Sequence, residues 1–210
     1  ENIKALENGI VNLERHIENI KKFGLQPIIA INHFILDTKR EIQVIKDFSK
    51  KIGVEVSVSK HWSDGGKGAK DLAKKVIKIC NKSNTKKFNY LYEENLPIWK
   101  KIEKIAKEIY RSNKVTASEE VKRQIEEFEK NGFNKLPVCI AKTQYSFSVD
   151  PKLKGAPINH EIPIREVRLS SGANFIVVVC GSIMTMPGLP KIPAADKIKI
   201  NKKGETEGLF

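Results

Sequence analysis

The sequence has few of the residues that build disulfide- or metal-held folds. It contains three cysteines, Cys80, Cys139 and Cys180, which lie far apart in the chain. This number and spacing fit neither a disulfide framework nor a zinc-ligand pattern. Each cysteine lies in an apolar stretch, so we expect three buried thiols in a protein of a reducing compartment, the cytoplasm. The four histidines also lack metal-ligand spacing, and the sequence predicts no metal site.

Long hydrophobic runs are absent as well. No apolar stretch approaches the ~18 residues that a membrane span requires, so we expect no membrane partner. The chain begins Glu-Asn-Ile-Lys, without a starting methionine or the apolar core of a signal peptide. We therefore expect it to be part of something longer. Its 210 residues suffice for one large domain or two small ones with a substantial core.

Arginine is scarce although the chain is strongly basic. The net charge is +13, yet only six of its 38 basic residues are arginines. Base recognition favours the planar arginine side chain, and here the lysines are scattered among glutamates in helical segments. This pattern is typical of solvated helix faces, so we expect no nucleic-acid partner. The positive field would still attract anionic substrates.

Familiar catalytic motifs are missing too. The sequence contains no Gly-x-Ser-x-Gly elbow and no paired-carboxylate signature. The glycine-rich run 65–68 is not a Walker A loop, because no Gly-Lys-Ser/Thr follows at the required spacing. No catalytic residue can be assigned from these patterns.

The first third of the chain alternates between helical and strand patterns. Apolar residues recur at helical spacing over 10–20, and a capping box of Thr38 and Glu41 predicts a second helix ending at Gly53. Apolar runs over 28–31 and 54–58 predict strands, the first buried on both faces. A third helix follows the glycines at 65–68. This order favours part of a parallel α/β sheet, with a boundary in the polar stretch 81–87.

Beyond that boundary the pattern is α+β. Helices are expected over 99–109, with Pro97 near the first turn, and over 121–128, preceded by the capping pair of Thr116 and Glu119. Strand patterns follow over 137–141, 161–169, 173–180 and 197–200. A run rich in proline and glycine, 181–193, predicts a rigid loop, which serves either a function or a strand-to-strand crossover.

Two loops follow the predicted parallel strands at their carboxyl ends, where ligands bind in open α/β sheets. The first begins with Asn32 and contains Phe34, and the second contains Trp62 and ends with Gly65 and Gly66. The two aromatic rings could clamp a flat heterocycle, or both could fold onto the core. The glycines could present N–H groups to an anion or simply allow a helix to start. A polar run at 142–148 follows another predicted strand, and it could be either part of a ligand site or an ordinary turn.

Short runs spread over nearly the whole chain carry a family resemblance. They comprise 12–13, 16–19, 27–32 with Phe34, 37–38 with Glu41, Trp62 with 65–66, 136–148, 172–173 with 175–177, 183–191 and 208–210. The order and content of these runs resemble the C-terminal part of formate–tetrahydrofolate ligases. The longest two, 136–148 and 183–191, are the most specific.

The resemblance implies a fold and a reaction. It implies the C-terminal part of a P-loop-type parallel α/β domain over residues 1–84, followed by a smaller α+β domain over 85–210. The enzymes of the family make formyl phosphate from ATP and formate, and N10 of tetrahydrofolate then takes the formyl group. The implied cofactors are ATP with Mg²⁺, with tetrahydrofolate as substrate, and dependence on a monovalent cation stays open. The implied partners are the missing N-terminal half and further copies in a homo-oligomer.

The resemblance also implies binding residues. Phe34 and Trp62 would sandwich the flat ring of folate or nucleotide, and Ile35 and Val58 would be apolar walls of the same pocket. Asn32, Gly65 and Gly66 complete the predicted binding set.

Three departures qualify the resemblance. The P-loop is absent from this chain, so we expect it to be inactive alone. Ser182 stands where an acidic residue is expected, and His33 where a basic one is, which leaves any role of these positions open. An alternative function is a subunit-interface or binding module without its own ligand site.

Overall fold

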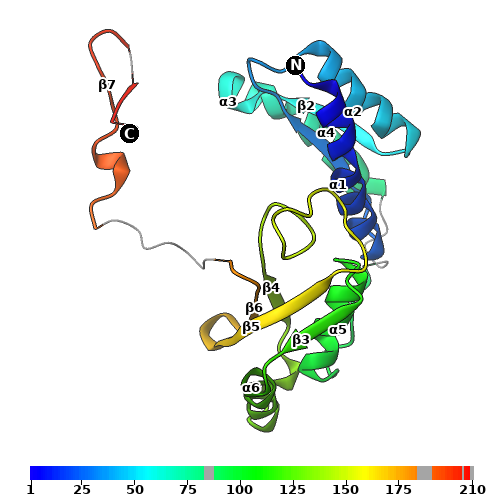
Figure 1. The fold of residues 1–210 in the computed structure, drawn as a ribbon. Helices are drawn as coiled ribbons and strands as arrows, with labels where there is room; N and C mark the ends of the chain where they lie inside the picture. Colours follow the sequence, from blue (N-terminus) through cyan, green and yellow to red (C-terminus); the bar gives the residue numbers. More distant parts are fainter. Residues whose placement is uncertain (83–87, 184–190, 205, 209–210) are drawn as a thin grey trace.

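The computed structural model describes residues 1–82, 88–183, 191–204 and 206–208. Within these residues the strands form three sheets, one of four strands and two of two strands. Figure 1 shows the two-stranded sheet of the N-terminal part above the four-stranded sheet of the C-terminal part. The architecture is α/β with parallel strands, as the sequence predicts, while the P-loop arrangement of a complete domain stays a prediction.

The N-terminal part alternates helices and strands. In chain order its elements are α1 (Ile3–Lys22), β1 (Ile28–Asn32), α2 (Lys39–Lys51), β2 (Glu55–Ser59), α3 (His61–Asp64), the 3₁₀ turn η1 (Gly65–Ala69) and α4 (Lys70–Lys82). Strands β1 and β2 are parallel, with Asn32 opposite Ser59 at their carboxyl ends. The capping box is present, since Thr38 Oγ1 accepts from the Glu41 N–H at 3.2 Å and Glu41 accepts from the Thr38 N–H at 2.9 Å.

The core of this part lies on one face of the small sheet. Ile29 and Ile31 of β1 are buried there together with Ile17 of α1 and Val54. The expectation that the first strand is buried on both faces is wrong, because Ala30, between the two isoleucines, is exposed. Successive side chains of a strand point to opposite faces, and the helices α1 and α2 cover only one of them. The helix α4, on the other face, has no buried residue among those described.

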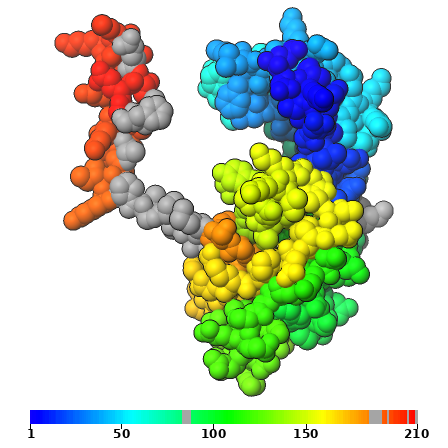
Figure 2. Space-filling model, in the orientation of Figure 1, coloured from blue at the N-terminus to red at the C-terminus, as the bar shows by residue number. Residues whose placement is uncertain are grey.

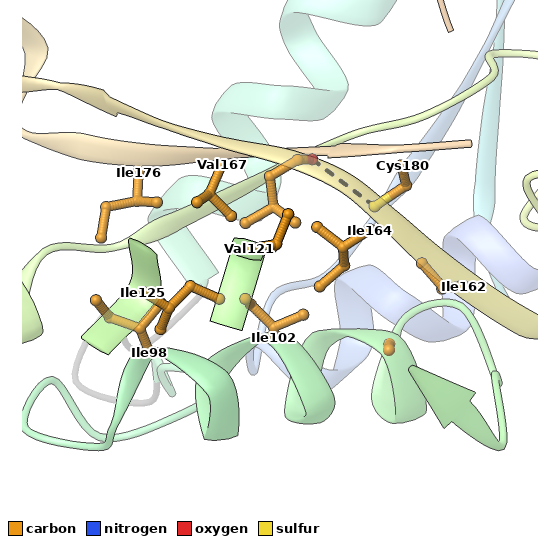
Figure 3. Packing of buried hydrophobic residues seen from close by; sticks show 11 residues of the cluster. Ile98, Ile102, Val121, Ile125, Ile162, Ile164, Val167, Ile176 and Cys180 are labelled. Atoms are coloured by element: carbon orange, nitrogen blue, oxygen red, sulfur yellow. Dashed lines mark hydrogen bonds between the residues drawn. The ribbon is translucent and has the colours of Figure 1, made fainter. Parts of the chain in front are cut away.

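The C-terminal part is built on a mixed sheet. Its elements are α5 (Ile98–Glu108), β3 (Lys114–Ala117), α6 (Glu119–Lys130), η3 (Phe133–Lys135), β4 (Val138–Ala141), β5 (Glu161–Ser170), η4 (Ser171–Ala173) and β6 (Phe175–Cys180). The strand order is β3-β5-β6-β4, with β5 and β6 antiparallel and the two outer pairs parallel. The core fills the space between this sheet and the helices α5 and α6 (Figure 3), with Ile98, Ile102, Ile125, Ile162 and Ile176 among its buried residues.

Strand β3 was not predicted from the sequence. The expected capping pair of Thr116 and Glu119 is wrong for Thr116. Thr116 lies inside β3, and Ser118 instead caps α6, where its hydroxyl accepts from the Val121 N–H at 3.3 Å. A strand of four residues gives little alternation, and Thr and Ser are both good capping residues. The sequence therefore placed the N-cap of this helix two residues too early.

A small hairpin follows near the end of the chain. It consists of the antiparallel strands β7 (Lys199–Ile200) and β8 (Thr206–Glu207) and is preceded by the 3₁₀ turn η5 (Ala194–Asp196); this segment is drawn in orange to red in Figures 1 and 2. The predicted strand over 197–200 corresponds to β7. Most of the predicted rigid loop, residues 184–190, and the predicted boundary residues 83–87 lie outside the described residues. The division into domains at residue 84 stays a prediction.

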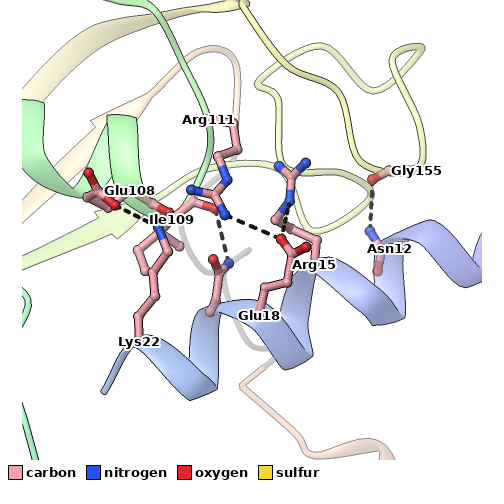
Figure 4. Close-up of polar contacts among 9 residues, drawn as sticks. Asn12, Arg15, Glu18, Lys22, Glu108, Ile109, Arg111 and Gly155 are labelled. Atoms are coloured by element: carbon pink, nitrogen blue, oxygen red, sulfur yellow. Dashed lines mark hydrogen bonds and ion pairs between the residues drawn. The ribbon is translucent and has the colours of Figure 1, made fainter. Parts of the chain in front are cut away.

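Helix α1 contacts both parts of the molecule. Leu13 and Ile17 pack under the N-terminal sheet, whereas polar residues on another side of α1 bind the C-terminal part (Figure 4). The bonds run from Asn12 Nδ2 to Gly155 O at 3.0 Å, from Asn19 Nδ2 to Ile109 O at 3.0 Å and from Lys22 Nζ to Glu108 O at 2.6 Å, and Glu18 pairs with Arg111 at 3.3 Å. This helix therefore links the two parts through a polar junction.

The expectation of three buried cysteines is correct only for Cys180. Cys139 is exposed because it lies on β4, an edge strand of the larger sheet, and Cys80 is exposed near the end of α4. Burial raises the pKa of the Cys180 thiol to about 12. In the described part of the chain, no helix combines the length and apolarity that a membrane crossing needs.

Candidate functional site

The two loops singled out in the sequence meet at one edge of the N-terminal sheet. One leaves the carboxyl end of β1 and carries Phe34, and the other leaves the carboxyl end of β2 and carries Trp62. The parallel register brings these ends together, since Asn32 and Ser59 are directly opposed. The His33 N–H extends the pairing by donating to Ser59 O at 3.0 Å.

The loop with Phe34 is held by local hydrogen bonds. The Phe34 N–H donates to Asp37 Oδ2 at 2.7 Å, and the Asp37 N–H donates back to Phe34 O at 3.1 Å. Thr38 follows at once as the N-cap of α2. This Asp-closed turn holds the backbone of Phe34 against the start of a helix, so the ring projects from a defined position.

The rings of Phe34 and Trp62 lie against each other. Their centroids are 5.8 Å apart and their planes are inclined by 21°, an offset stacked arrangement. The Trp62 indole Nε1–H donates to His33 O at 2.5 Å, which ties the second loop to the first. Neither ring joins the hydrophobic core: Phe34 is 52% exposed and Trp62 is 48% exposed. The structure thus brings together the two aromatic residues predicted from the sequence.

The other predicted binding residues lie at different depths. Ile35 is 81% exposed and stands beside Phe34 at the tip of the loop, and Asn32 is also exposed. Val58 is partly buried and packs against the core of Ile17, Ile29, Ile31 and Val54 beneath the loops. Ile35 therefore presents an exposed apolar side chain at the tip of the loop, whereas Val58 lies beneath the loops and packs on the core of the sheet.

The glycine run shapes the turn that follows Trp62. Gly65 has φ +55°, a left-handed conformation that glycine adopts without strain, and Gly66 has open space around it. Gly68 has the strictest requirement: a Cβ there would lie 2.4 Å from the carbonyl carbon of Lys60. The same close approach allows the Lys60 N–H to donate to Gly68 O at 3.1 Å. The run therefore closes the loop that presents Trp62.

Sequence analysis missed three residues that build this site. Asp37 closes the Phe34 turn, Gly68 allows the chain to pack on Lys60, and Ser59 binds both loops. The spacing of Asp37 three residues after Phe34 is a recognisable turn signal. The roles of Gly68 and Ser59 depend on contacts across the loop, and no local pattern indicates them.

The polar run 142–148 forms a turn that is organised around the ammonium group of Lys142. The Lys142 ammonium donates to the carbonyls of Thr143 at 2.8 Å, of Ser148 at 3.0 Å and of Ser146, which uses its three donors. It also lies 5.2 Å from the ring centroid of Tyr110. Burial lowers the pKa of Lys142 to about 8. These contacts favour a structural turn over a ligand site for this run.

A site for the implied Mg²⁺ is not found in the described residues. No group of three or more histidine, cysteine, aspartate or glutamate side chains within them could hold a metal ion. The sequence also lacks the Gly-Lys-Ser/Thr that would coordinate Mg²⁺ and phosphates in a P-loop.

Comparison with known proteins identifies the family. The family model for formate–tetrahydrofolate ligase matches residues 1–210. Over all 210 residues the chain is 57% identical to the formate–tetrahydrofolate ligase of Pelagibacter ubique (strain HTCC1062), of which it covers 37%. It is 52% identical to that of Ruegeria sp. (strain TM1040), with 38% covered, and 50% identical to that of Sinorhizobium fredii, with 37% covered. The chain thus spans little more than a third of these curated relatives, and it belongs to the formate–tetrahydrofolate ligase family.

Proposed function

We propose that this protein supplies part of the tetrahydrofolate and nucleotide pocket of an ATP-dependent ligase that forms 10-formyltetrahydrofolate. The observation that carries the proposal is the exposed pair Phe34 and Trp62, stacked at the carboxyl ends of two parallel strands. Family membership over the whole length of the chain supports the reaction class. Folate and adenine both contain flat heterocycles, which stack well on aromatic side chains.

The clamp would bind and orient the ring rather than react with it. In the proposed reaction ATP phosphorylates formate, and N10 of tetrahydrofolate then attacks the carbonyl carbon of formyl phosphate, which releases phosphate. MgATP supplies the phosphoryl group and the charge stabilisation when it is bound. Phe34, Trp62 and the exposed Ile35 would hold the ring and exclude water from its faces.

The observed ring spacing sets a condition on binding. A ring sandwiched between two others needs roughly 7 Å between the outer planes, twice the optimal carbon–carbon separation. The centroids of Phe34 and Trp62 are 5.8 Å apart, so the rings must separate by about 1 Å or more. Both rings are about half exposed, Phe34 in a loop and Trp62 in the short helix α3, and neither belongs to the core cluster, which makes such a movement feasible without disturbing the core.

Several parts of the proposal concern the whole enzyme. We infer that the P-loop, the Mg²⁺ ligands and any monovalent-cation site belong to the remainder of the longer chain, and that the enzyme works in the cytoplasm as a homo-oligomer. This chain alone should therefore make no 10-formyltetrahydrofolate. Product that depends on both formate and ATP, formed by the purified chain, would contradict this inference.

Calorimetric titration of tetrahydrofolate into this chain and its Trp62→Ala variant tests the clamp. We expect the variant to bind more weakly by ~1–3 kcal/mol, the range for loss of one stacked ring. Tyr90→Ala is the matched control, because Tyr90 is an exposed aromatic residue in the C-terminal part. Equal affinity of the wild type and Trp62→Ala would refute the clamp. Absence of binding to a folded wild-type chain would show that the pocket needs the rest of the enzyme.

The second candidate function is a subunit interface formed by the same loop. Its support is the apolar tip, where Ile35 is 81% and Leu36 is 87% exposed. Sedimentation velocity of the wild type and Ile35→Asp separates the two functions. A change of oligomeric state in the variant, with unchanged tetrahydrofolate affinity, would favour the interface. Weaker affinity in an unchanged oligomer would favour the clamp.

A further inference from the structure

Ser59, the last residue of β2, is bound to both loops of the clamp. Its main-chain oxygen accepts from the His33 N–H at 3.0 Å, and His33 directly precedes Phe34. Its hydroxyl is hydrogen-bonded with Nδ1 of His61 at 3.0 Å, and His61 directly precedes Trp62 in α3. One residue therefore anchors the segments that carry the two rings.

A third hydrogen bond closes these contacts into a ring. The indole Nε1–H of Trp62 donates to His33 O at 2.5 Å, so the chain of contacts runs from Ser59 through His33 and Trp62 to His61 and back to Ser59. In a closed ring each bond restrains the others, so both the direction of the indole and its distance from the Phe34 loop depend on every bond.

Because Ser59 is buried, the hydrogen bond of its hydroxyl to His61 is the bond in this ring that water can least easily replace. Ser59 is only 4% exposed, and a buried hydroxyl almost always keeps a hydrogen-bond partner. Its partner His61 is exposed and can turn to water when the bond is lost. Loss of the bond should therefore free α3 and Trp62 more than it destabilises the fold.

Ser57 provides an internal comparison. It lies two residues before Ser59, on the same face of β2, and is 2% exposed. Its hydroxyl donates to Asp71 Oδ2 of α4 at 2.6 Å, and in the described part of the chain it makes no side-chain bond to either clamp loop. The two serines thus share a strand, a face and a depth of burial, and differ in the element to which they bind.

We propose that Ser59 is a positioning residue of the aromatic clamp, which holds Trp62 beside Phe34 so that a small separation of the two rings is enough to admit a flat ring. The proposal rests on the proposed function for its ligand. The placement of Trp62 itself can be measured without any ligand, so the two ideas can fail separately.

The test uses the indole N–H signals of protein labelled with ¹⁵N-tryptophan. The chain has two tryptophans, Trp62 and Trp99, and Trp62→Phe assigns their signals. In Ser59→Ala we expect the solvent exchange of the Trp62 indole proton to rise about three- to tenfold, the value of one hydrogen bond. Tetrahydrofolate affinity should fall by a similar factor. Exchange of the Trp99 indole proton should stay unchanged. In Ser57→Ala, both the exchange of the Trp62 indole proton and the affinity for tetrahydrofolate should equal those of the wild type.

A second pair of variants avoids any change in the buried strand. His61→Asn retains a polar nitrogen or oxygen near the position of Nδ1, whereas His61→Ala removes it. Position 61 is exposed, so neither substitution changes the core. We expect His61→Asn to resemble the wild type and His61→Ala to resemble Ser59→Ala. Unchanged Trp62 exchange in Ser59→Ala, an equal rise in Ser57→Ala, or equal behaviour of the two His61 variants would overturn the proposal. Faster Trp62 exchange in Ser59→Ala, with no tetrahydrofolate bound by any variant, would uphold the positioning role and refute the folate assignment.

Discussion

The buried lysine of α5 provides the sharpest test of the energetics of the C-terminal part. Lys101 is 0% exposed, and its ammonium donates to Asn134 O at 2.5 Å and to Leu136 O at 3.0 Å. It also lies 5.8 Å from the ring centroid of Tyr92. Burial lowers the pKa of Lys101, partly offset by Glu94 and Glu129. The side chain therefore fastens α5 to the turn that leads into β4.

Two substitutions separate its polar and apolar contributions. Lys101→Met keeps most of the stem and removes the ammonium, which leaves two carbonyls without their donor at a cost of about 1–3 kcal/mol. Lys101→Ala also removes three buried methylenes, each worth about 0.8 kcal/mol, and so should cost about 3–5 kcal/mol in total. For a chain of this size each kcal/mol lowers Tm by about 2–4 °C.

Urea denaturation at pH 7 measures both costs, with Lys100→Met as the control. Lys100 is the exposed neighbour on the same helix, paired with Glu103 at 2.8 Å, and its loss should change stability by no more than about 0.5 kcal/mol. If Lys101→Met were as stable as the wild type or more so, desolvation of the ammonium would outweigh its hydrogen bonds, and the fastening role would be refuted. Equal losses for Met and Ala would refute the packing role of the stem.

Two further predictions concern a glycine and a histidine. Gly68→Ala should weaken tetrahydrofolate binding and lower stability by about 1–3 kcal/mol, because its Cβ would meet the Lys60 carbonyl at 2.4 Å. Gly66→Ala, whose Cβ meets open space, should leave stability unchanged, and equal losses of stability for Gly66→Ala and Gly68→Ala in urea denaturation would refute the steric argument. Burial lowers the pKa of His160 below the 6.5 of the unfolded chain, and neither ring nitrogen makes a hydrogen bond of ordinary geometry within the described structure. The unfolded chain therefore binds more protons below pH 6.5, so the unfolding free energy should fall from pH 7 to pH 5, with a smaller fall in His160→Gln. Equal pH slopes of the two proteins in urea titrations would contradict this assignment.

Local sequence patterns determined most elements of this protein and the candidate clamp residues. The Thr38–Glu41 capping box, the apolar strands and the helical spacing of α1 each depend on neighbours within a few residues, so the sequence alone predicts them. The loops after β1 and β2 follow from the parallel order of the strands. The four-residue strand β3 was missed because so short a segment carries no clear alternation.

Tertiary structure decided what depends on residues far apart in the chain. The register of β1 and β2 brings Phe34 and Trp62 into contact, and Ser59 binds both loops, although no local spacing predicts either result. Cys139 is apolar in context yet exposed, because its strand lies at the edge of the sheet. Propensity and capping act over a few residues, whereas burial and ring contacts depend on which distant segments pack together. The sequence therefore predicts the parts of the clamp, and only the packed chain determines its geometry.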